Sequence, residues 1–296
     1  MIDFTTFIER YEQLKSLLPP PEKVSEYQFD GLHIRVYEPK IVASDILLVY
    51  HGGGVNSDAG YDVLARQLTQ ALPVCVCLVD IRGHGRSVGH KGDISKPEQI
   101  WRDVDTVIQN IRTFSPSSRI HLLGHSSGGG MLINYFTRHV PVQKSDSLIL
   151  VAPAYGPFAP SDLQIPSSVP FASVQKWTFI INALSAGFLA GNHVGVKLNF
   201  PADVISSRED FIQKYSVNMA NALTPRNPAK QLEALPLPVK ILHAEHDELF
   251  DSCRMEAFAK GCHNPKISSR IVEGSTHLDC IFMLTDQMRE HFAGPD

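Results

Sequence analysis

Residues 119–130 read R-I-H-L-L-G-H-S-S-G-G-G, and this stretch decides the predicted fold. An apolar run typical of a buried strand, residues 120–123, leads into a G-x-S-x-G pattern centred on Ser126, and residues 131–136 carry the apolar side of a helix. The glycines two positions before and after the serine let the strand and the helix approach closely, so the serine is held out on a sharp turn. A plain glycine-rich surface loop is the alternative, but the flanking strand and helix favour Ser126 as a nucleophile.

Two strand ends further along the chain supply the partners that a serine nucleophile needs. A serine hydroxyl reacts poorly unless a base takes its proton, and an acid must orient that base. The predicted strand at 239–243 ends shortly before Asp247, and the strand at 269–272 leads into a loop that contains His277. The order Ser126, Asp247, His277, with each residue beyond the carboxyl end of a strand, is that of the α/β-hydrolase triad.

Other carboxylates near the same strand end are weaker candidates for the acid. Three of them flank Asp247 in the sequence: Glu245, Glu248 and Asp251. Some hydrolases instead carry the acid after the strand that follows the nucleophile helix, but no carboxylate follows the strand at 148–151 until Asp162. Asp247 is therefore the predicted acid, and the three flanking residues are its alternatives.

The H-G-G-G run at residues 51–54 is the predicted source of an oxyanion hole, although a plain flexible turn is the alternative. Attack of a serine on a carbonyl creates an oxyanion, which two preorganised N–H groups stabilise. One is expected from the amide of Ser127, the residue after the nucleophile. The other is expected from Gly53, with Gly54 as second choice, because glycines let a backbone approach the substrate. The side chain of His51 is expected to hold this turn by hydrogen bonding.

With these motifs the chain resembles the α/β-hydrolases of the monoacylglycerol lipase and lysophospholipase group, also called serine aminopeptidase-like hydrolases. The most discriminating shared stretch is D-x-R-G-H-G-x-S at residues 80–87, between the oxyanion run and the serine turn. The resemblance covers residues 30–152 and 236–293 and implies an α/β-hydrolase fold. The chain departs from the group in three ways. Ser127 stands where a methionine is usual, and the glycine that is usual four residues before the acid is shifted to Ala244 at three before. A third glycine in H-G-G-G leaves more room near a substrate carbonyl.

The order of predicted elements indicates an α/β fold with an insertion. Strands alternate with long helices, which is typical of a mostly parallel central sheet with helices on both faces. In chain order we expect a helix at 3–17, strands at 33–38 and 46–50, a helix at 58–71, a strand at 74–79, a helix at 97–114, the serine turn with its helix, and a strand at 147–152. Residues 1–152 and 236–296 are predicted to form the α/β-hydrolase core, and residues 153–235 a helical lid.

The predicted lid contains two helices. Residues 171–190 carry large apolar side chains at helical spacing, and residues 208–223 form a second, more polar helix. A lid that excludes water from a site can also hold a hydrocarbon chain, so Phe171 and Trp177 are candidate contacts for a substrate. The alternative is that this apolar stripe only packs the lid.

Composition and charge exclude several classes of partner. Hydrophobic residues make up 43% of the chain, charged residues 20%, and the formal net charge is -4, so no basic excess favours nucleic acid or an anionic membrane surface. No run has the length and hydropathy needed to cross a bilayer, and the N-terminus lacks the pattern of a signal peptide. We expect a cytoplasmic protein without a stable membrane anchor, and the sequence leaves its oligomeric state open.

Histidines near the predicted acid do not indicate a metal centre. His243 and His246 flank Glu245, but the chain has no H-E-x-x-H motif, and the triad explains the acid beside them. We predict neither a metal nor a cofactor.

The triad and the resemblance together predict a serine hydrolase that cleaves carboxylic esters through an acyl-enzyme. Monoacylglycerols, lysophospholipids and short-to-medium aliphatic esters are the expected substrates. A thioesterase, an acyltransferase or a cofactor-free perhydrolase would use the same triad with another leaving group or acceptor. A ligand-binding protein that kept the fold and lost the chemistry is a third interpretation, which an intact triad disfavours.

Overall fold

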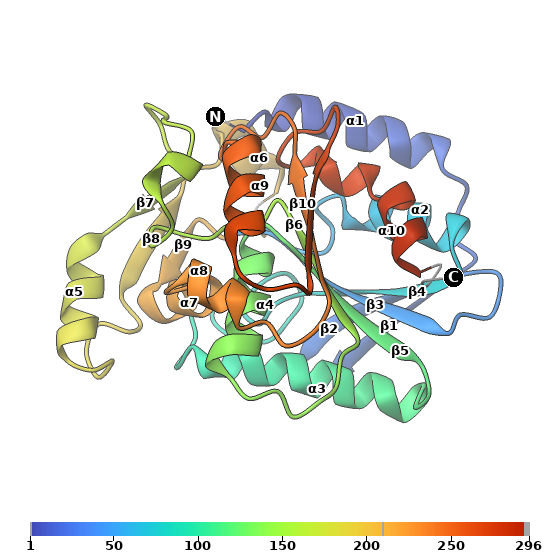
Figure 1. Cartoon of the computed structure of the whole chain (residues 1–296), viewed down its shortest axis with the longest axis horizontal. Coiled ribbons are helices and arrows are strands. Elements are labelled where there is room, and N and C mark those ends of the chain that lie inside the picture. The colour runs from blue at the N-terminus through green and yellow to red at the C-terminus, as the bar shows by residue number, and fades with distance from the viewer. Residues whose placement is uncertain (1, 209, 293–296) are drawn as a thin grey trace.

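The computed structural model describes residues 2–208 and 210–292, and its centre is an eight-stranded sheet (Figure 1). The strands lie in the order β1-β2-β4-β3-β5-β6-β10-β11. Their bounds are β1 Lys23–Phe29, β2 Leu32–Glu38, β3 Asp45–Tyr50, β4 Val74–Val79, β5 Arg119–His125, β6 Ser147–Val151, β10 Val239–Ala244 and β11 Ile267–Val272. β2 is antiparallel to both of its neighbours, and all other neighbouring strands are parallel. The predicted fold class is thereby confirmed.

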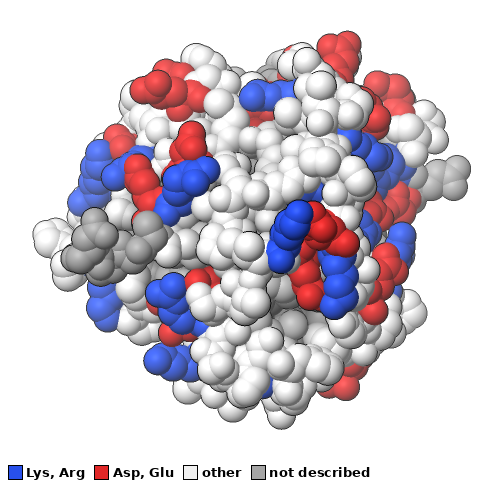
Figure 2. All heavy atoms as spheres, turned by 90° about the vertical axis from the view of Figure 1, so that its right-hand side faces the viewer, with Lys and Arg blue, Asp and Glu red and all other residues white. Residues whose placement is uncertain are grey.

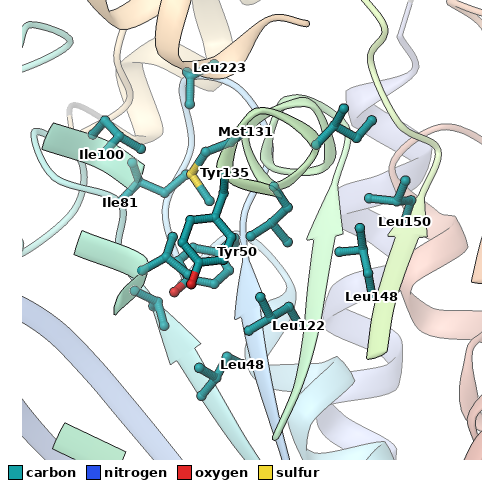
Figure 3. Close-up of a cluster of buried hydrophobic side chains, with 14 of the residues drawn as sticks. Leu48, Tyr50, Ile81, Ile100, Leu122, Met131, Tyr135, Leu148, Leu150 and Leu223 are labelled. Atoms are coloured by element: carbon teal, nitrogen blue, oxygen red, sulfur yellow. The ribbon is translucent and has the colours of Figure 1, made fainter. Parts of the chain in front are cut away.

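The central strands form because they are rich in apolar residues and are buried along their whole length. Every residue of β3, β6 and β10 is buried, as expected for a parallel sheet that helices cover on both faces. The covering helices are α1 (Phe4–Leu17), α2 (Tyr61–Ala71) and α10 (Thr285–Phe292) on one side, and α3 (Glu98–Phe114), α4 (Ser127–Arg138) and α9 (Ser252–Gly261) on the other (Figure 1). Figure 3 shows the core on the second side, where Met131 and Tyr135 of α4 meet Tyr50 and Leu122 of the strands.

β1 is a strand that the hydrophobic pattern did not predict. It pairs with β2 across a tight turn at Asp30 and Gly31, whose φ angles are 51° and 77°. Asp-Gly is a strong signal for a two-residue hairpin turn, because both positions need a positive φ. That dipeptide was therefore the one local signal that could have identified this hairpin.

The insertion, residues 153–235, lies between β6 and β10 and is less helical than predicted. Its elements are a short 3-10 helix (Ser161–Leu163), β7 (Ala172–Val174), α5 (Lys176–Leu184), β8 (Val194–Leu198), α6 (Ala202–Ser207), β9 (Lys214–Ser216), α7 (Val217–Leu223) and α8 (Pro228–Glu233). β7, β8 and β9 form a separate antiparallel sheet.

Both predicted helices of the insertion were wrong in extent. The range 171–190 begins with β7, which pairs with β8, and α5 ends at Leu184 because the chain turns at Ala186 and Gly187, where φ is positive. The range 208–223 contains β9 before the short helix α7. The spacing of apolar residues along one segment carries no information about this pairing between segments.

Charges of both signs are distributed over the surface. On the face shown in Figure 2, Lys and Arg side chains lie beside Asp and Glu in small mixed groups. Ion pairs among the described residues include Lys23 with Glu38 and Arg270 with Glu290, each at 2.7 Å. Within residues 2–208 and 210–292, no helix combines the length and hydropathy required to span a lipid bilayer.

Candidate active site

Ser126 lies on the turn between β5 and α4 in a backbone conformation that side-chain-bearing residues rarely adopt. Its φ is 51° and its ψ is −117°. A Cβ on Gly124 would lie 2.6 Å from the backbone of Gly128, and a Cβ on Gly128 would lie 2.6 Å from the carbonyl oxygen of His51. The two outer glycines of the G-x-S-x-G pattern are therefore required by the close packing of β5, α4 and the loop that begins at His51.

The structure brings Ser126, Asp247 and His277 together at the carboxyl ends of β5, β10 and β11. The Nε2 atom of His277 lies 3.0 Å from Oγ of Ser126, and its Nδ1 atom lies 2.8 Å from Oδ2 of Asp247. The other carboxylate oxygen of Asp247 accepts the N–H groups of Leu249 at 2.8 Å and Phe250 at 3.1 Å. This carboxylate is therefore fixed so that Nδ1–H of His277 donates to it, and the lone pair of Nε2 faces the serine hydroxyl.

The surroundings of His277 favour its charged form. Burial alone would lower the pKa of His277, but the charge of Asp247 and the hydrogen bond to it raise that pKa above its ordinary value of 6.5. His125, which precedes Ser126 in the sequence, behaves in the opposite way, because burial lowers its pKa to about 3. Of these two histidines, only His277 is suited to exchange a proton near neutral pH.

The three alternative acids have other partners in the structure. Glu245 accepts the N–H of Gly274 at 2.7 Å, and Asp251 caps α9. Glu248 accepts the backbone N–H of His277 at 2.9 Å, so it supports the histidine loop without touching the imidazole ring. Of the four carboxylates, Asp247 is the one that bonds the ring. The supporting contact of Glu248 was not predicted from the sequence.

The H-G-G-G run forms the loop after β3 and lies beside the start of α4. A Cβ on Gly53 would lie 3.2 Å from Oγ of Ser127, so the two residues chosen for the oxyanion hole are neighbours. Within the described part of the chain, neither of their N–H groups makes a hydrogen bond. As predicted, His51 holds the turn: its Nδ1–H donates to the carbonyl oxygen of Gly52 at 2.9 Å, and its Nε2 accepts the N–H of Ile81 at 3.1 Å.

Tyr61 fixes the loop on one side of Gly53. Its hydroxyl oxygen accepts the N–H of Gly52 at 2.8 Å, and its O–H donates to Nδ1 of His125 at 2.7 Å. The other ring nitrogen of His125 donates to the carbonyl oxygen of His277 at 2.9 Å. Through Tyr61, His125 thus connects the glycine loop to the histidine loop.

Tyr215, from the insertion, fixes the loop on the other side. Its hydroxyl oxygen accepts the N–H of Gly54 at 2.5 Å, and its O–H donates to Nε2 of His84 at 2.7 Å. Burial lowers the pKa of His84 to about 3, so this ring stays neutral and can accept. The N–H groups of Gly52 and Gly54 are thus both engaged by tyrosines. Gly54, the second choice for the oxyanion hole, has its N–H directed at Tyr215, whereas the N–H of Gly53 remains available.

The D-x-R-G-H-G-x-S stretch builds the turn after β4. Asp80 accepts the backbone N–H of Arg86 at 2.9 Å and lies 3.2 Å from Nδ1 of His33. Burial alone would raise the pKa of Asp80. The hydrogen bond from His33 outweighs burial and holds this pKa well below its usual range. Arg82 forms two contacts of 2.7 Å with the carboxylate of Asp103. These contacts stabilise the turn.

A cavity of about 280 Å³ lies in front of Ser126 and His277. Its walls are mainly apolar, and Phe171 contributes to them. Trp177, the other candidate contact, does not line this cavity and is 77% exposed, so the structure gives its predicted substrate contact no support. α5 is short and lies at the far edge of the insertion (Figure 1), and its apolar side chains Ile180, Ile181 and Leu184 are exposed as well.

The N-terminal helix α1 forms another wall of this cavity, a role that the sequence analysis did not assign to it. Its lining residues are Phe4, Phe7, Ile8, Tyr11 and Glu12. The four apolar members have the spacing i, i+3, i+4, i+7 of an amphipathic helix. This spacing identifies the helix and its apolar face, but it does not reveal which surface that face covers.

A mostly parallel sheet with a serine, a histidine and an aspartate grouped beyond its strand ends defines an α/β-hydrolase. A model of the family described as serine aminopeptidase, S33, matches residues 42–279, and the chain belongs to this family.

Individual relatives agree with this assignment. Monoglyceride lipase of Mus musculus is 25% identical over 256 residues, which cover 84% of this chain and 81% of that protein. Among solved structures, a variant of monoglyceride lipase from Saccharomyces cerevisiae in complex with a substrate analogue has a TM-score of 0.65 at 17% identity, covering 94% of this chain and 96% of that one. The monoacylglycerol lipase of Paleococcus ferrophilus has a TM-score of 0.59 at 17% identity, covering 88% and 96%. The protein is thus an α/β-hydrolase of the monoglyceride lipase-like group, of the lipase and esterase type.

Proposed function

We propose that the protein hydrolyses carboxylic esters through an acyl-enzyme formed on Ser126. The observation that carries this proposal is the pair of contacts made by His277, whose ring nitrogens lie 3.0 Å from Oγ of Ser126 and 2.8 Å from Oδ2 of Asp247. Because a carboxylate orients one nitrogen, the other is positioned to take the serine proton.

In the proposed mechanism, Oγ of Ser126 attacks the acyl carbon while Nε2 of His277 takes its proton. The N–H groups of Gly53 and Ser127 donate to the oxyanion that forms. The bond to the alcohol then breaks, and His277 returns its proton to the leaving oxygen, which gives the acyl-enzyme and the free alcohol. Water attacks the acyl-enzyme through the same steps and releases the carboxylic acid. No cofactor takes part.

The cavity supports an ester with an apolar chain. Its volume of about 280 Å³ is near the lower end of the range typical of small-molecule sites, about 300 to 1,000 Å³, and apolar side chains dominate its walls. The relatives described above are monoglyceride lipases. We therefore propose monoacylglycerols, lysophospholipids or short-to-medium aliphatic esters as substrates, with the insertion at 153–235 as a lid on a core formed by residues 1–152 and 236–296.

A substrate screen with the purified protein tests this proposal. The substrates are p-nitrophenyl esters of acids with two to sixteen carbons, monoacylglycerols, lysophospholipids and acyl-CoA thioesters. We expect turnover of esters. If only thioesters were turned over, the protein would be a thioesterase that uses the same triad, and the proposal of an ester hydrolase would be wrong. A protein that turns over none of them and does not react with a fluorophosphonate would be a ligand-binding protein without catalysis.

The pH dependence of ester hydrolysis should report the environment of His277. The base must be neutral to accept the serine proton, and the pKa of His277 is raised above 6.5, so kcat/KM is expected to fall as the pH decreases through a value above 6.5. In Asp247→Asn the charge that raises this pKa is gone while burial, which lowers it, remains. A pH–rate profile of both proteins measures the midpoints, and a midpoint that does not move to lower pH in the variant would contradict this account.

A further inference from the structure

The helix α1 contacts the same cavity as the reacting groups although it lies outside residues 42–279, the part of the chain that the family model matches. Phe4, Phe7, Ile8 and Tyr11 of α1 line the same cavity as Gly53, Ser126 and His277. The wall that α1 supplies is therefore additional to the part of the chain that defines the family.

Aromatic rings hold α1 against the insertion and against the segment that follows the histidine loop. The ring of Phe4 lies 5.6 Å from that of Phe200 in the insertion. The ring of Phe7 stacks on Phe282, with 5.3 Å between centroids and 9° between the planes. Phe282 belongs to the 3-10 helix η2 (Asp279–Met283), which directly follows the loop of the triad histidine. α1 thus bridges the insertion and the histidine loop.

Two carboxylates add polar ties between α1 and the histidine loop. Glu248 accepts the backbone N–H of Asp3 at 3.0 Å with one oxygen and that of His277 at 2.9 Å with the other. Asp279 forms an ion pair with Arg10 through one carboxylate oxygen. Its other oxygen accepts the backbone N–H of Thr276, the residue before His277, at 2.6 Å. Each carboxylate holds the helix on one side and the histidine loop on the other, so the two are positioned together.

We propose that α1 is a substrate-binding element, which contacts the acyl chain of the ester and makes the enzyme prefer longer chains to very short ones. The inference rests on the proposed function, because only an ester bound at Ser126 would place a chain in this cavity. In monoacylglycerols and lysophospholipids the hydrocarbon chain is on the acyl side, and the cavity offers it five phenylalanine rings: Phe4, Phe7, Phe171, Phe200 and Phe211. Transfer of that chain from water to these apolar walls favours binding in proportion to the area covered.

Covalent labelling of the whole protein with two fluorophosphonates tests the inference. The probes carry an ethyl or a decyl chain on phosphorus, so they react with the same serine and differ only in the chain. The wall variants are Phe7→Ala, which removes a ring, and Ile8→Gln, which replaces apolar surface by an amide. Phe188→Ala is the matched control, because Phe188 is 90% exposed and does not line the cavity.

The ratio of the decyl to the ethyl labelling rate constant is the readout. We expect this ratio to fall by about 10-fold or more in both wall variants, the scale of lost contacts in hydrophobic pockets, and to stay at the wild-type value in Phe188→Ala. Ile8 is 41% exposed and glutamine is a good helix former, so Ile8→Gln is expected to fold even if Phe7→Ala does not. A wild-type ratio in folded Ile8→Gln would overturn the inference and leave the proposed function intact. If neither probe labels the wild type, the proposed function fails and the inference falls with it.

Discussion

The Ser126→Ala variant is expected to lose ester turnover by about 10⁶-fold and to lose fluorophosphonate labelling, while its fold is retained. The reason is that the substitution removes only the Oγ atom, whose partner is Nε2 of His277 at 3.0 Å. Alanine and serine meet the same steric limits at a φ of 51°, so the turn itself should not change. Turnover of p-nitrophenyl esters and the mass of the labelled protein measure the two losses.

A serine elsewhere on the surface provides the control for this experiment. Ser117 is exposed after α3, and Ser117→Ala should behave as the wild type in both assays. Circular dichroism and the melting temperature of Ser126→Ala establish that its fold is intact. Labelling of Ser126→Ala at the wild-type rate would show that another residue is the nucleophile.

The Asp247→Asn variant is expected to lower kcat by about 10³ to 10⁴-fold. An asparagine can keep an oxygen toward the N–H groups of Leu249 and Phe250, which turns its NH₂ group toward Nδ1 of His277. The imidazole must then carry its proton on Nε2, and this tautomer cannot accept the proton of Ser126. Steady-state kinetics on an activated ester measure the loss.

Asp251→Asn is the matched control, because it makes the same chemical change four residues away. Asp251 caps α9 by accepting the N–H of Arg254 at 3.0 Å and does not contact the imidazole. Asparagine is also a good cap, so both kcat and the melting temperature should stay near the wild-type values. If Asp251→Asn lost activity and Asp247→Asn kept it, the orienting acid would lie one helical turn further along the chain.

The central sheet could be predicted from the sequence because strands that are buried on both faces consist of continuous apolar runs, which are visible in each segment by itself. β3 and β6 are apolar at every position after their first residues, Asp45 and Ser147, and such runs between loops indicate strands of a parallel sheet. β1 could not be recognised in this way, because it is an edge strand in which only Phe29 is buried.

The insertion could not be predicted as well, because apolar spacing shows a face but not its partner. Trp177 and Leu184 have the spacing of a buried stripe, yet they are 77% and 85% exposed. Conversely, α1 has a modest apolar face that covers the cavity. Whether another surface meets an apolar face is decided by tertiary packing, which no single segment encodes.

Some residues of the candidate site could be predicted from the sequence, and others could not. Ser126, Asp247 and His277 could be selected because each lies within a few residues of a strand end and their order along the chain is informative. The roles of Tyr215 and Glu248 depend on contacts between distant segments, such as the hydrogen bond that joins Tyr215 to Gly54 across 161 positions. No local motif records a contact of that kind.

The strained backbone conformation of Ser126 lowers the stability of the fold at the residue whose hydroxyl the proposed reaction requires. A residue with a side chain in so sparsely populated a conformation costs about 1 to 3 kcal/mol, and a folded domain is stable by only about 5 to 15 kcal/mol. Glycine at this position would relieve the strain, since a φ of 51° is open to it, but it has no hydroxyl to acylate. The sequence with the highest melting temperature at this turn is therefore not the one that can carry out the proposed reaction, and stabilisation of this protein has to come from positions away from the turn.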